Sequence, residues 1–436
     1  MNSPPNNLFF CPEPQHHQLA QIAGGDRFVR LQRHFFHASL LALLGGFGVA
    51  TSRLPAATDA VHIEPSTIFS AKDIPGGGAL HLPSLLVTRR GTVLAVCQMR
   101  KSSPGDWGHD TDVILRRSQD GGITWGPTQV IFSEAGVNAV NGPLVEVQEN
   151  GTIILPFTKV PAGGGSMSDW VQSQISIGGG IWIQSSQDEG KTWSRPVETK
   201  PSGPTGWVAW ANNSSHGVEF PDGRLVIPGM AQRLEPEFGP SHAMQYSACL
   251  LLSDDHGRTW HIGAITPYYG TDEVAVTICG DGSLLASIRI NNRQPNDLVR
   301  LLARSRDRGE SFTESSLVDH LSLNDCHAGL TSAREKSWRG ERSVIVHSGP
   351  QGGNVQQPLD RSHLSLRLSF DDGQSWPVSK LIATPRKDTE YSDVGVAADG
   401  TIMCLYGVDT FSKTESRMEL VRFNLRSFEI DRSSFN

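Results

Sequence analysis

Seven side chains that are scattered along this sequence carry groups able to bind or transform a charged ligand. They comprise three arginines, two carboxylic acids, a tyrosine and a histidine: His81, Arg100, Asp106, Glu273, Arg289, Arg361 and Tyr391. An arginine stays charged and presents a planar fork of donors, which can bind a carboxylate through two parallel hydrogen bonds. These residue types predict a pocket for an anionic ligand, provided that the fold brings them together.

A short repeated segment indicates what kind of fold this is. SQDGGITW, SQDEGKTW, SDDHGRTW, SRDRGESF and SFDDGQSW begin at residues 118, 186, 253, 305 and 369, and they share the pattern S-x-D-x-G-x-[TS]-[WF]. In such a turn Asp accepts backbone hydrogen bonds, Gly adopts a positive φ and the aromatic side chain enters the adjacent core. Copies roughly 50 to 70 residues apart predict an array of equivalent units.

Strand-like runs joined by a tight glycine turn alternate with these segments. LLVTRRGTVLAV at residues 85–96 and VGVAADGTIMCLYG at residues 394–407 are two of the six hairpins that this pattern predicts. Six hairpins and five repeated segments predict an all-β fold, a six-bladed β-propeller with four-stranded antiparallel blades spanning residues 61–430. The strand that the last blade lacks is expected from residues 61–70, which would close the ring.

The strand order separates the repeated segments from the seven candidate residues. In a four-stranded meander the glycine turn and the repeated segment lie on one face of the disk, which predicts a structural role for them. The seven candidates instead fall at the starts of first strands, at the ends of second strands and in the connections to third strands. We therefore expect them to converge near the central axis. His216 lies on the same side and is a candidate either for the pocket wall or for packing.

The repeated segments resemble the Asp-boxes of the sialidase (neuraminidase) superfamily, and the resemblance covers residues 70 to 425. GDGSLLASIRINN, LDRSHLSLRLSFDDGQSWPVSKLI and YSDVGVAADGTIMCLY look like segments of bacterial exo-sialidases. The resemblance implies a propeller with five Asp-boxes that removes terminal alpha-linked sialic acid from glycoconjugates with retention of configuration. The implied partner is a sialylated or another acidic glycan, and no metal or organic cofactor is implied.

The resemblance also implies a role for each candidate residue. Tyr391 would be the nucleophile, Glu273 the base that takes its proton, and Asp106 the acid and base toward the leaving sugar. Asp110 and Asp112 are alternatives to Asp106 in the same loop, and Asp272 is the alternative to Glu273. The arginines would bind the substrate carboxylate: Arg289, Arg361 and, as a further pocket arginine, Arg100.

The chemistry of sialic acid gives a separate reason for a tyrosine nucleophile. The anomeric carbon of this sugar bears a carboxylate, so that a carboxylate nucleophile would approach it against a like charge. A phenol that loses its proton to a glutamate during the attack avoids this repulsion, and sialidases are accordingly an exception to the two-carboxylate scheme of glycosidases.

One position departs from the family pattern. Sialidases open the first blade with Arg-Ile-Pro, whereas this chain has His81, Leu82 and Pro83. Histidine, with a pKa of about 6.5, is only partly charged at neutral pH and cannot form the bidentate fork of an arginine. The sequence leaves three alternatives: weaker sialidase activity, a glycosidase for another acidic sugar, or a non-catalytic glycan-binding propeller. If His81 binds as an imidazolium, affinity should fall as the pH rises.

The remaining sequence features concern export and partners. Basic residues followed by an apolar run, RFVRLQRHFFHASLLALLGGFGVATS, predict that residues 1–58 form a signal peptide with an N-terminal extension. The protein is therefore expected to be secreted or periplasmic, with no stable membrane span after cleavage. A net charge of −7 without basic runs argues against nucleic acid as a partner.

Overall fold

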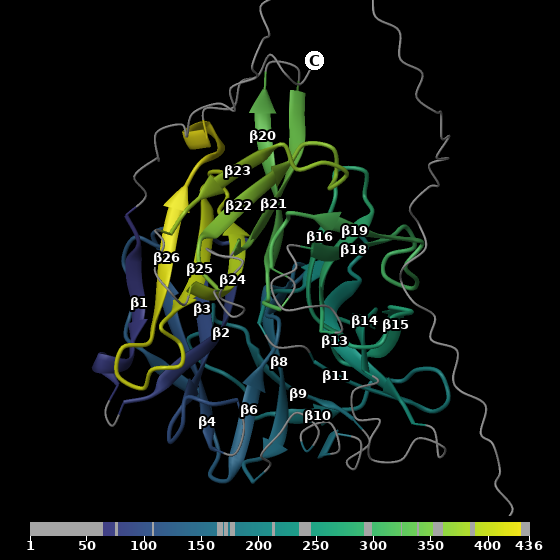
Figure 1. Cartoon of the computed structure of the whole chain (residues 1–436). Helices are drawn as coiled ribbons and strands as arrows, with labels where there is room; N and C mark the ends of the chain where they lie inside the picture. The colour runs from purple at the N-terminus through teal and green to yellow at the C-terminus, as the bar shows by residue number, and fades with distance from the viewer. Residues whose placement is uncertain are drawn as a thin grey trace, which may run out of the picture. The chain divides into compact units, whose positions relative to one another are not determined.

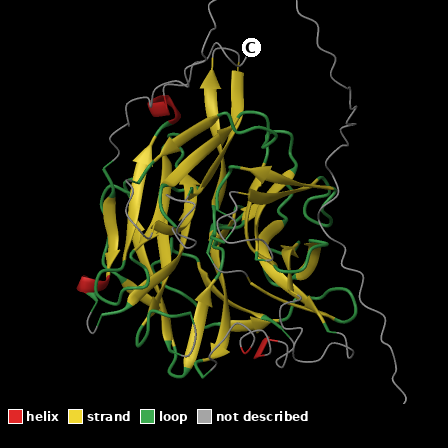
Figure 2. Ribbon diagram, viewed as in Figure 1, coloured by secondary structure: helices red, strands yellow, loops and turns green. Residues whose placement is uncertain are grey.

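A computed structural model describes residues 64–428, except 75–76, 107–108, 164–168, 170–172, 175–178, 212–213, 235–245, 292–298, 324, 338–339, 352–360 and 384–388. The expected signal peptide lies outside the described residues and stays a prediction. Strands dominate the described part, accompanied by short 3-10 helices such as η1 (Ala71–Asp73) and η3 (Leu425–Phe428) (Figure 2). No helix found in the described residues is long and apolar enough to cross a bilayer.

Six antiparallel sheets form the blades of a β-propeller, which confirms the predicted fold class (Figure 1). Blades 2 and 3 each have a divided first strand, because β6 and β7 both pair with β8, and β11 and β12 both pair with β13. The strands of blades 1 to 3 are β2 (Ala79–Val87), β3 (Val93–Arg100), β4 (Thr111–Ser118), β5 (Gln129–Ser133), β6 (Val137–Asn141), β7 (Val145–Val147), β8 (Thr152–Pro161), β9 (Ile181–Ser186), β10 (Val197–Thr199), β11 (Trp207–Ala211), β12 (Val218–Glu219), β13 (Leu225–Arg233), β14 (Tyr246–Ser253) and β15 (His261–Ile265).

The last blade closes the ring with a strand from the other end of the domain. β1 (Ser66–Ser70) pairs antiparallel with β26 and so completes blade 6, as the sequence predicts. The first strands of neighbouring blades contact each other, and they therefore surround the central axis. The strands of blades 4 to 6 are β16 (Thr271–Ile278), β17 (Leu284–Ile290), β18 (Val299–Ser305), β19 (Glu314–Asp319), β20 (Gly329–Ser337), β21 (Gly340–Pro350), β22 (Leu364–Ser369), β23 (Val378–Leu381), β24 (Thr389–Val396), β25 (Ile402–Val408) and β26 (Arg417–Phe423).

The core lies between the blades, because both faces of each sheet are covered by a neighbour. Successive side chains of a strand point to opposite faces. In β3, Leu94 and Val96 pack in a cluster shared with blade 2, while Ala95 and Cys97 pack in a cluster shared with blade 6. Equivalent clusters join each other pair of neighbouring blades. Blade 6 packs on blade 1 in the same way, so that the ring is closed by a continuous apolar interface.

Each of the five Asp-boxes connects its own blade to the one before it. In the third box the Asp255 carboxylate accepts hydrogen bonds from the N–H of Arg258 (3.0 Å) and of Thr259 (2.9 Å) and from the Thr259 hydroxyl (2.6 Å). Gly257 has a φ of +82°, and a Cβ there would overlap Ile154 of blade 2. Trp260 is buried in the cluster between blades 2 and 3. The box is thus a turn that fixes one blade against its predecessor.

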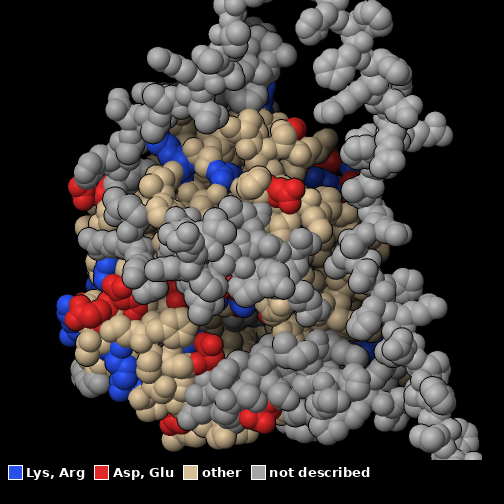
Figure 3. Space-filling model, viewed as in Figure 1, with Lys and Arg blue, Asp and Glu red and all other residues tan. Residues whose placement is uncertain are grey.

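On the described part of the face in Figure 3, positive and negative side chains are mixed rather than separated by sign. Figure 3 shows acidic and basic side chains next to one another on the visible face. Exposed ion pairs are part of this pattern, such as the one between Lys72 and Glu415 (2.7 Å).

Candidate active site

Irregular strand pairing turns consecutive side chains toward the central axis. The register shifts at the start of β2, β16 and β24, which are the first strands of blades 1, 4 and 6. A β-bulge breaks the alternation of side chains between the two faces of a sheet, and bulges are common next to active sites. Three pairs of neighbours in the sequence face one cavity for this reason: His81 and Leu82, Asp272 and Glu273, and Glu390 and Tyr391.

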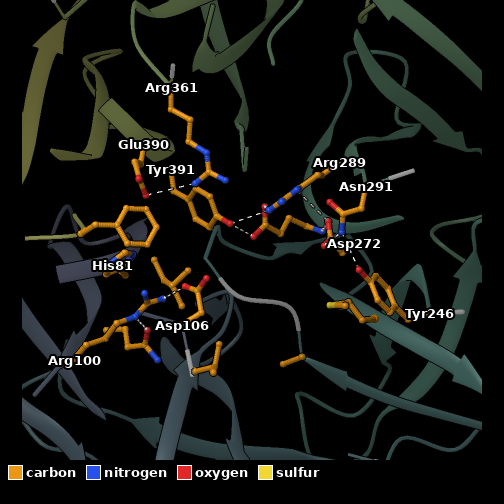
Figure 4. Close-up of a pocket in the computed structure, with 17 residues that line it drawn as sticks. His81, Arg100, Asp106, Tyr246, Asp272, Arg289, Asn291, Arg361, Glu390 and Tyr391 are labelled. Atoms are coloured by element: carbon orange, nitrogen blue, oxygen red, sulfur yellow. Dashed lines mark hydrogen bonds and ion pairs between the residues drawn. The ribbon is translucent and has the colours of Figure 1, made fainter. Parts of the chain in front are cut away.

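The cavity has a volume of about 280 Å³ and brings together all seven residues that the sequence singles out (Figure 4). It lies at the ends of the blades away from the Asp-boxes, none of which contributes to its wall. The rest of its lining consists of Leu82, Gln98, Val140, Ala211, Met230, Tyr246, Asp272, Asn291, Glu390 and Phe411.

Tyr391, Glu273 and Arg289 form a connected triplet at the centre of the site. The Tyr391 hydroxyl donates a hydrogen bond to Oε1 of Glu273, and Nη1 of Arg289 donates to Oε2 of the same carboxylate at 2.8 Å. The same Arg289 nitrogen lies 2.9 Å from the Tyr391 oxygen and donates to it. Glu273 is only 4% exposed, so that these contacts are made away from bulk water. The triplet therefore places a phenol, a carboxylate and a cation within direct contact.

The electrostatics of the triplet assign a protonation state to each group. Burial alone would raise the pKa of Glu273, but the Arg289 guanidinium outweighs it and holds this pKa below its usual range. Burial and the Glu273 charge raise the pKa of the Tyr391 phenol well above its usual range. At neutral pH the pair is therefore an ionised carboxylate that accepts a hydrogen bond from a neutral phenol.

A second carboxylate supports the arginine from the other side. Asp272 precedes Glu273, and its Oδ1 lies 3.8 Å from Nε of Arg289. Its Oδ2 accepts a hydrogen bond of 2.5 Å from the Asn291 amide, which also donates to the Tyr246 hydroxyl at 2.8 Å. Burial raises the pKa of Asp272, against the opposing influence of Arg289. Glu273, and not Asp272, is the carboxylate that contacts Tyr391.

Arg361 approaches the tyrosine from the opposite side. Its guanidinium lies 5.4 Å from the centre of the Tyr391 ring, and its Nη2 donates to the backbone oxygen of Asp325 at 2.8 Å. Its Nη1 lies 3.6 Å from Oε2 of Glu390, the residue before the tyrosine. Arg361 and Arg289 thus reach the Tyr391 side chain from two different blades, as the prediction of an arginine-lined anion pocket requires.

Asp106 lies at the rim of the cavity in contact with Arg100. Nη2 of Arg100 is 2.7 Å from Oδ1 of Asp106, and the Asp106 side chain is 51% exposed. Arg100 is in turn held by Oε1 of Gln98 (2.9 Å) and by the backbone oxygen of Pro104 (2.8 Å). The two alternative acids of the loop point elsewhere: Asp110 accepts from the Gly136 N–H and Asp112 pairs with Lys101.

His81 lines the cavity in surroundings that oppose a charge on its imidazole while no anion is bound. The side chain is buried and meets the Phe411 ring edge-on, with 5.1 Å between the ring centres. Burial, and then the nearby Arg100 charge, lower the pKa of His81 well below 6.5. Its Nε2 is buried and has no hydrogen-bond partner within the described part of the chain. The binding of a carboxylate by His81 as an imidazolium therefore stays a prediction, and burial works against it in the empty cavity.

Other polar residues were misplaced or missed by sequence reasoning. His216 is not in this cavity: its Nδ1 lies 3.0 Å from Oδ1 of Asp393, and the residue lines a separate cavity near the opposite ends of the first strands. Glu390 and Asn291 line the site without having been predicted. Glu390 directly precedes Tyr391, but only the bulge in β24 turns both toward the same cavity.

Comparison with known proteins identifies the family. Residues 91–404 match the family described as the BNR repeat-like domain. A sialidase from Bacteroides fragilis is 28% identical over 344 residues, which cover 75% of this chain and 60% of that protein. A sialidase from Micromonospora viridifaciens is 27% identical over 372 residues, which cover 82% of this chain and 54% of its length. The chain belongs to the BNR repeat-like domain family and is a bacterial-type member of the sialidase superfamily.

The structural comparison agrees at the level of the fold. The solved structure of the Hadza microbial sialidase Hz136 superposes with a TM-score of 0.66 at 22% identity, over 84% of this chain and 69% of that one. The chain spans less than two thirds of the length of the two curated relatives. The part shared with the solved structure is therefore the propeller fold.

Proposed function

We propose that this protein is an exo-sialidase that hydrolyses terminal alpha-linked sialic acid with retention of configuration. The observation that carries the proposal is the contact between the Tyr391 hydroxyl and the Glu273 carboxylate, inside a cavity lined by three arginines. A binding-only propeller would not need a buried nucleophile and base in contact. The names of the relatives support sialic acid as the substrate.

In the proposed first step the phenolic oxygen of Tyr391 attacks the anomeric carbon. Its proton passes to Oε1 of Glu273, and Asp106 gives a proton to the glycosidic oxygen as that bond breaks. Because the proton passes to Glu273 only during the attack, the tyrosine stays neutral until then. A neutral nucleophile is not repelled by the substrate carboxylate. In the second step Asp106 takes a proton from water, and the water oxygen attacks the anomeric carbon as the bond from that carbon to the Tyr391 oxygen breaks. The released Tyr391 oxygen takes its proton back from Glu273.

The arginines supply the recognition of the substrate in this proposal. Arg289 and Arg361 bind the substrate carboxylate, since they approach Tyr391 from two sides. Arg100 holds Asp106 at the rim, where the leaving sugar would lie, and its position beside His81 lets it contribute to carboxylate binding. Asp106 is half exposed, so that the water of the second step can reach it.

Turnover of an aryl sialoside by the purified protein tests the function. The wild type is expected to release the phenol between pH 4 and 8, and Tyr391→Phe to lose the covalent step while keeping its fold and its affinity for free N-acetylneuraminic acid. Proton-transfer groups of this kind contribute about 10²–10⁴-fold to the rate. The turnover rate of Asp106→Asn should therefore fall by that factor with a substrate whose aglycone has a high pKa. Absence of hydrolysis at every pH would refute the proposal.

A second candidate function follows from the part of the cavity wall that His81 forms. A neutral imidazole and Phe411 stand where the family places a charged arginine, which favours a less polar substituent near this wall. The candidate is a glycosidase for another acidic sugar with the same anomeric carboxylate. Parallel assays with aryl glycosides of sialic acid and of its deaminated analogue separate the two, since only the preferred sugar should show the higher kcat/KM.

We also propose that the chain is exported, on the basis of the basic and apolar residues between 27 and 50. Expression of the full sequence in a bacterial host, followed by N-terminal sequencing of the periplasmic fraction, tests this. Recovery of the uncleaved protein from the cytoplasm alone would contradict it.

A further inference from the structure

Each arginine of the cavity already has a carboxylate partner before any ligand binds. The separations are 2.7 Å for Arg100 with Asp106, 2.8 Å for Arg289 with Glu273, and 3.6 Å for Arg361 with Glu390 (Figure 4). The first two partners have roles in the proposed reaction. Glu390 has none, and its pair with Arg361 is the longest of the three. A ligand carboxylate would therefore displace Glu390 at the lowest cost.

Glu390 is a buried group that faces charges from several elements. It is 4% exposed, and it lines the cavity from the bulge at the start of β24. Arg361 faces it from the segment before β22, Arg100 from β3 and Asp106 from the loop after β3, while Tyr391 follows it on its own strand. His81 of β2 lies beside the same two arginines and is neutral. Asp325 adds a third carboxylate, because its Oδ2 lies 4.0 Å from Nε of Arg361. The local balance is thus two cations against three carboxylates.

Binding of an anion to Arg361 would change this balance. If the substrate carboxylate takes the guanidinium, an ionised Glu390 is left as a buried anion whose nearest cation is occupied by another anion. An uncompensated buried charge is strongly unfavourable, and a buried carboxyl in such a position takes up a proton instead. Proton uptake would leave the pocket with the same net charge before and after binding.

We propose that Glu390 acts as an internal competitor of the substrate carboxylate for Arg361, and that binding of an anionic sugar displaces it with uptake of one proton from solvent. The inference rests on the proposed function, because it assumes that Arg361 binds a sugar carboxylate. Burial already raises the pKa of Glu390 in the ligand-free protein, against the opposing influence of Arg361. Glu390 is then a specificity-determining residue: a neutral sugar cannot displace it, whereas a strongly acidic one can.

The sign of the pH dependence follows from the direction of proton transfer. Above the pKa of Glu390 in the free protein, each bound ligand must bring one proton with it, so that affinity falls up to tenfold per pH unit. Below that pKa the carboxyl is already neutral and affinity no longer depends on it. The ligand carboxylate stays ionised throughout, because sialic acid is a strong carboxylic acid.

Calorimetric titration with free N-acetylneuraminic acid counts the protons directly. The full chain is titrated at pH 7.0 in two buffers of different ionisation enthalpy, and the difference in measured heat gives the number of protons taken up. The wild type should take up close to one proton per ligand, and Glu390→Gln close to none. The variant should also bind with nearly the same affinity at pH 5.5 and 7.5. Its kcat should change less than its KM.

A matched control exists in the same blade. Glu419 is 8% exposed and pairs with Arg417 at 2.6 Å, but it does not line the cavity. Glu419→Gln should therefore keep the proton uptake and pH dependence of the wild type. Glu390→Met, which has similar volume and no charge, serves as a second variant if the glutamine variant fails to fold.

The outcomes separate this inference from the function on which it rests. Binding with the same proton uptake in wild type and in Glu390→Gln would overturn the inference and leave the function intact. Tighter binding by the variant at pH 7.5, with no proton uptake, would support both. Absence of any binding to wild type and variants would refute the proposed function, and the inference with it.

Discussion

The neutral state of His81 can be tested by replacing its ring with a neutral amide. In His81→Gln the side chain keeps a hydrogen-bond donor and loses the ability to become a cation. Because burial and Arg100 hold the pKa of His81 well below 6.5, the wild-type ring is uncharged at neutral pH. The substitution should therefore change the affinity for N-acetylneuraminic acid by the same factor at pH 6.0, 7.0 and 8.0.

The size of the effect follows from the contact that is exchanged. A neutral hydrogen bond contributes about 0.5–1.5 kcal/mol, which is at most about tenfold in affinity. Since glutamine can donate a similar bond, we expect a change within about threefold for His81→Gln, and up to about tenfold for His81→Leu. The dissociation constant is measured by calorimetry, with the melting temperature as a check of folding. If the wild type lost affinity tenfold per pH unit and His81→Gln abolished that trend, the imidazole would be charged and the reasoning wrong.

Restoring the arginine of the family pattern should not improve this pocket by itself. The ring of His81 already contacts Phe411, and Arg100 and Arg361 both contribute positive charge at the site. A larger side chain in a packed wall costs about 1–3 kcal/mol, so His81→Arg should lower the melting temperature. Phe411→Ala in the same chain should recover part of the loss by making room. A more stable His81→Arg single variant would contradict this view of the wall.

Two further predictions concern stability. Asp255→Ala should lower the free energy of unfolding by about 2 kcal/mol with kcat unchanged, because it removes the hydrogen bonds of one turn far from the cavity; a loss of activity without loss of stability would contradict it. Burial lowers the pKa of His81, His327 and His347, so that only the unfolded chain takes up their protons. The unfolding free energy in urea should therefore fall below about pH 6.5, by up to about 1.4 kcal/mol per pH unit for each ring, and a flat profile would refute this.

The architecture could be predicted because its signals are local. Each Asp-box carries the residues of its own turn, and Asp255 and Thr259 satisfy one another within five residues. The tight glycine turns are equally short-range. Counting these turns gives the number of blades, and the shortage of one strand in the last blade points to the start of the domain. β1 pairs with β26 as that count requires.

The finer structure of the site could not be predicted, because it depends on contacts between blades. Nothing in the letters T-E-Y-S shows that the pairing of β24 shifts there and turns Glu390 and Tyr391 to the same side. The charge state of His81 depends on burial against Phe411, which lies more than 300 residues away. Sequence patterns report which faces are apolar, but not how far a carboxyl is removed from water or which arginine it meets.

The arrangement separates the part of each blade that holds the ring together from the part that does chemistry. Asp-boxes lie where third and fourth strands join, and their aromatic residues enter the interfaces between blades. The bulged ends of β2, β16 and β24 lie at the other face and can be irregular because the blades on both sides support them. Glu273 of β16 and Tyr391 of β24 meet there across the axis. Substitution in a box should therefore act on stability, and substitution at a bulge on binding and turnover.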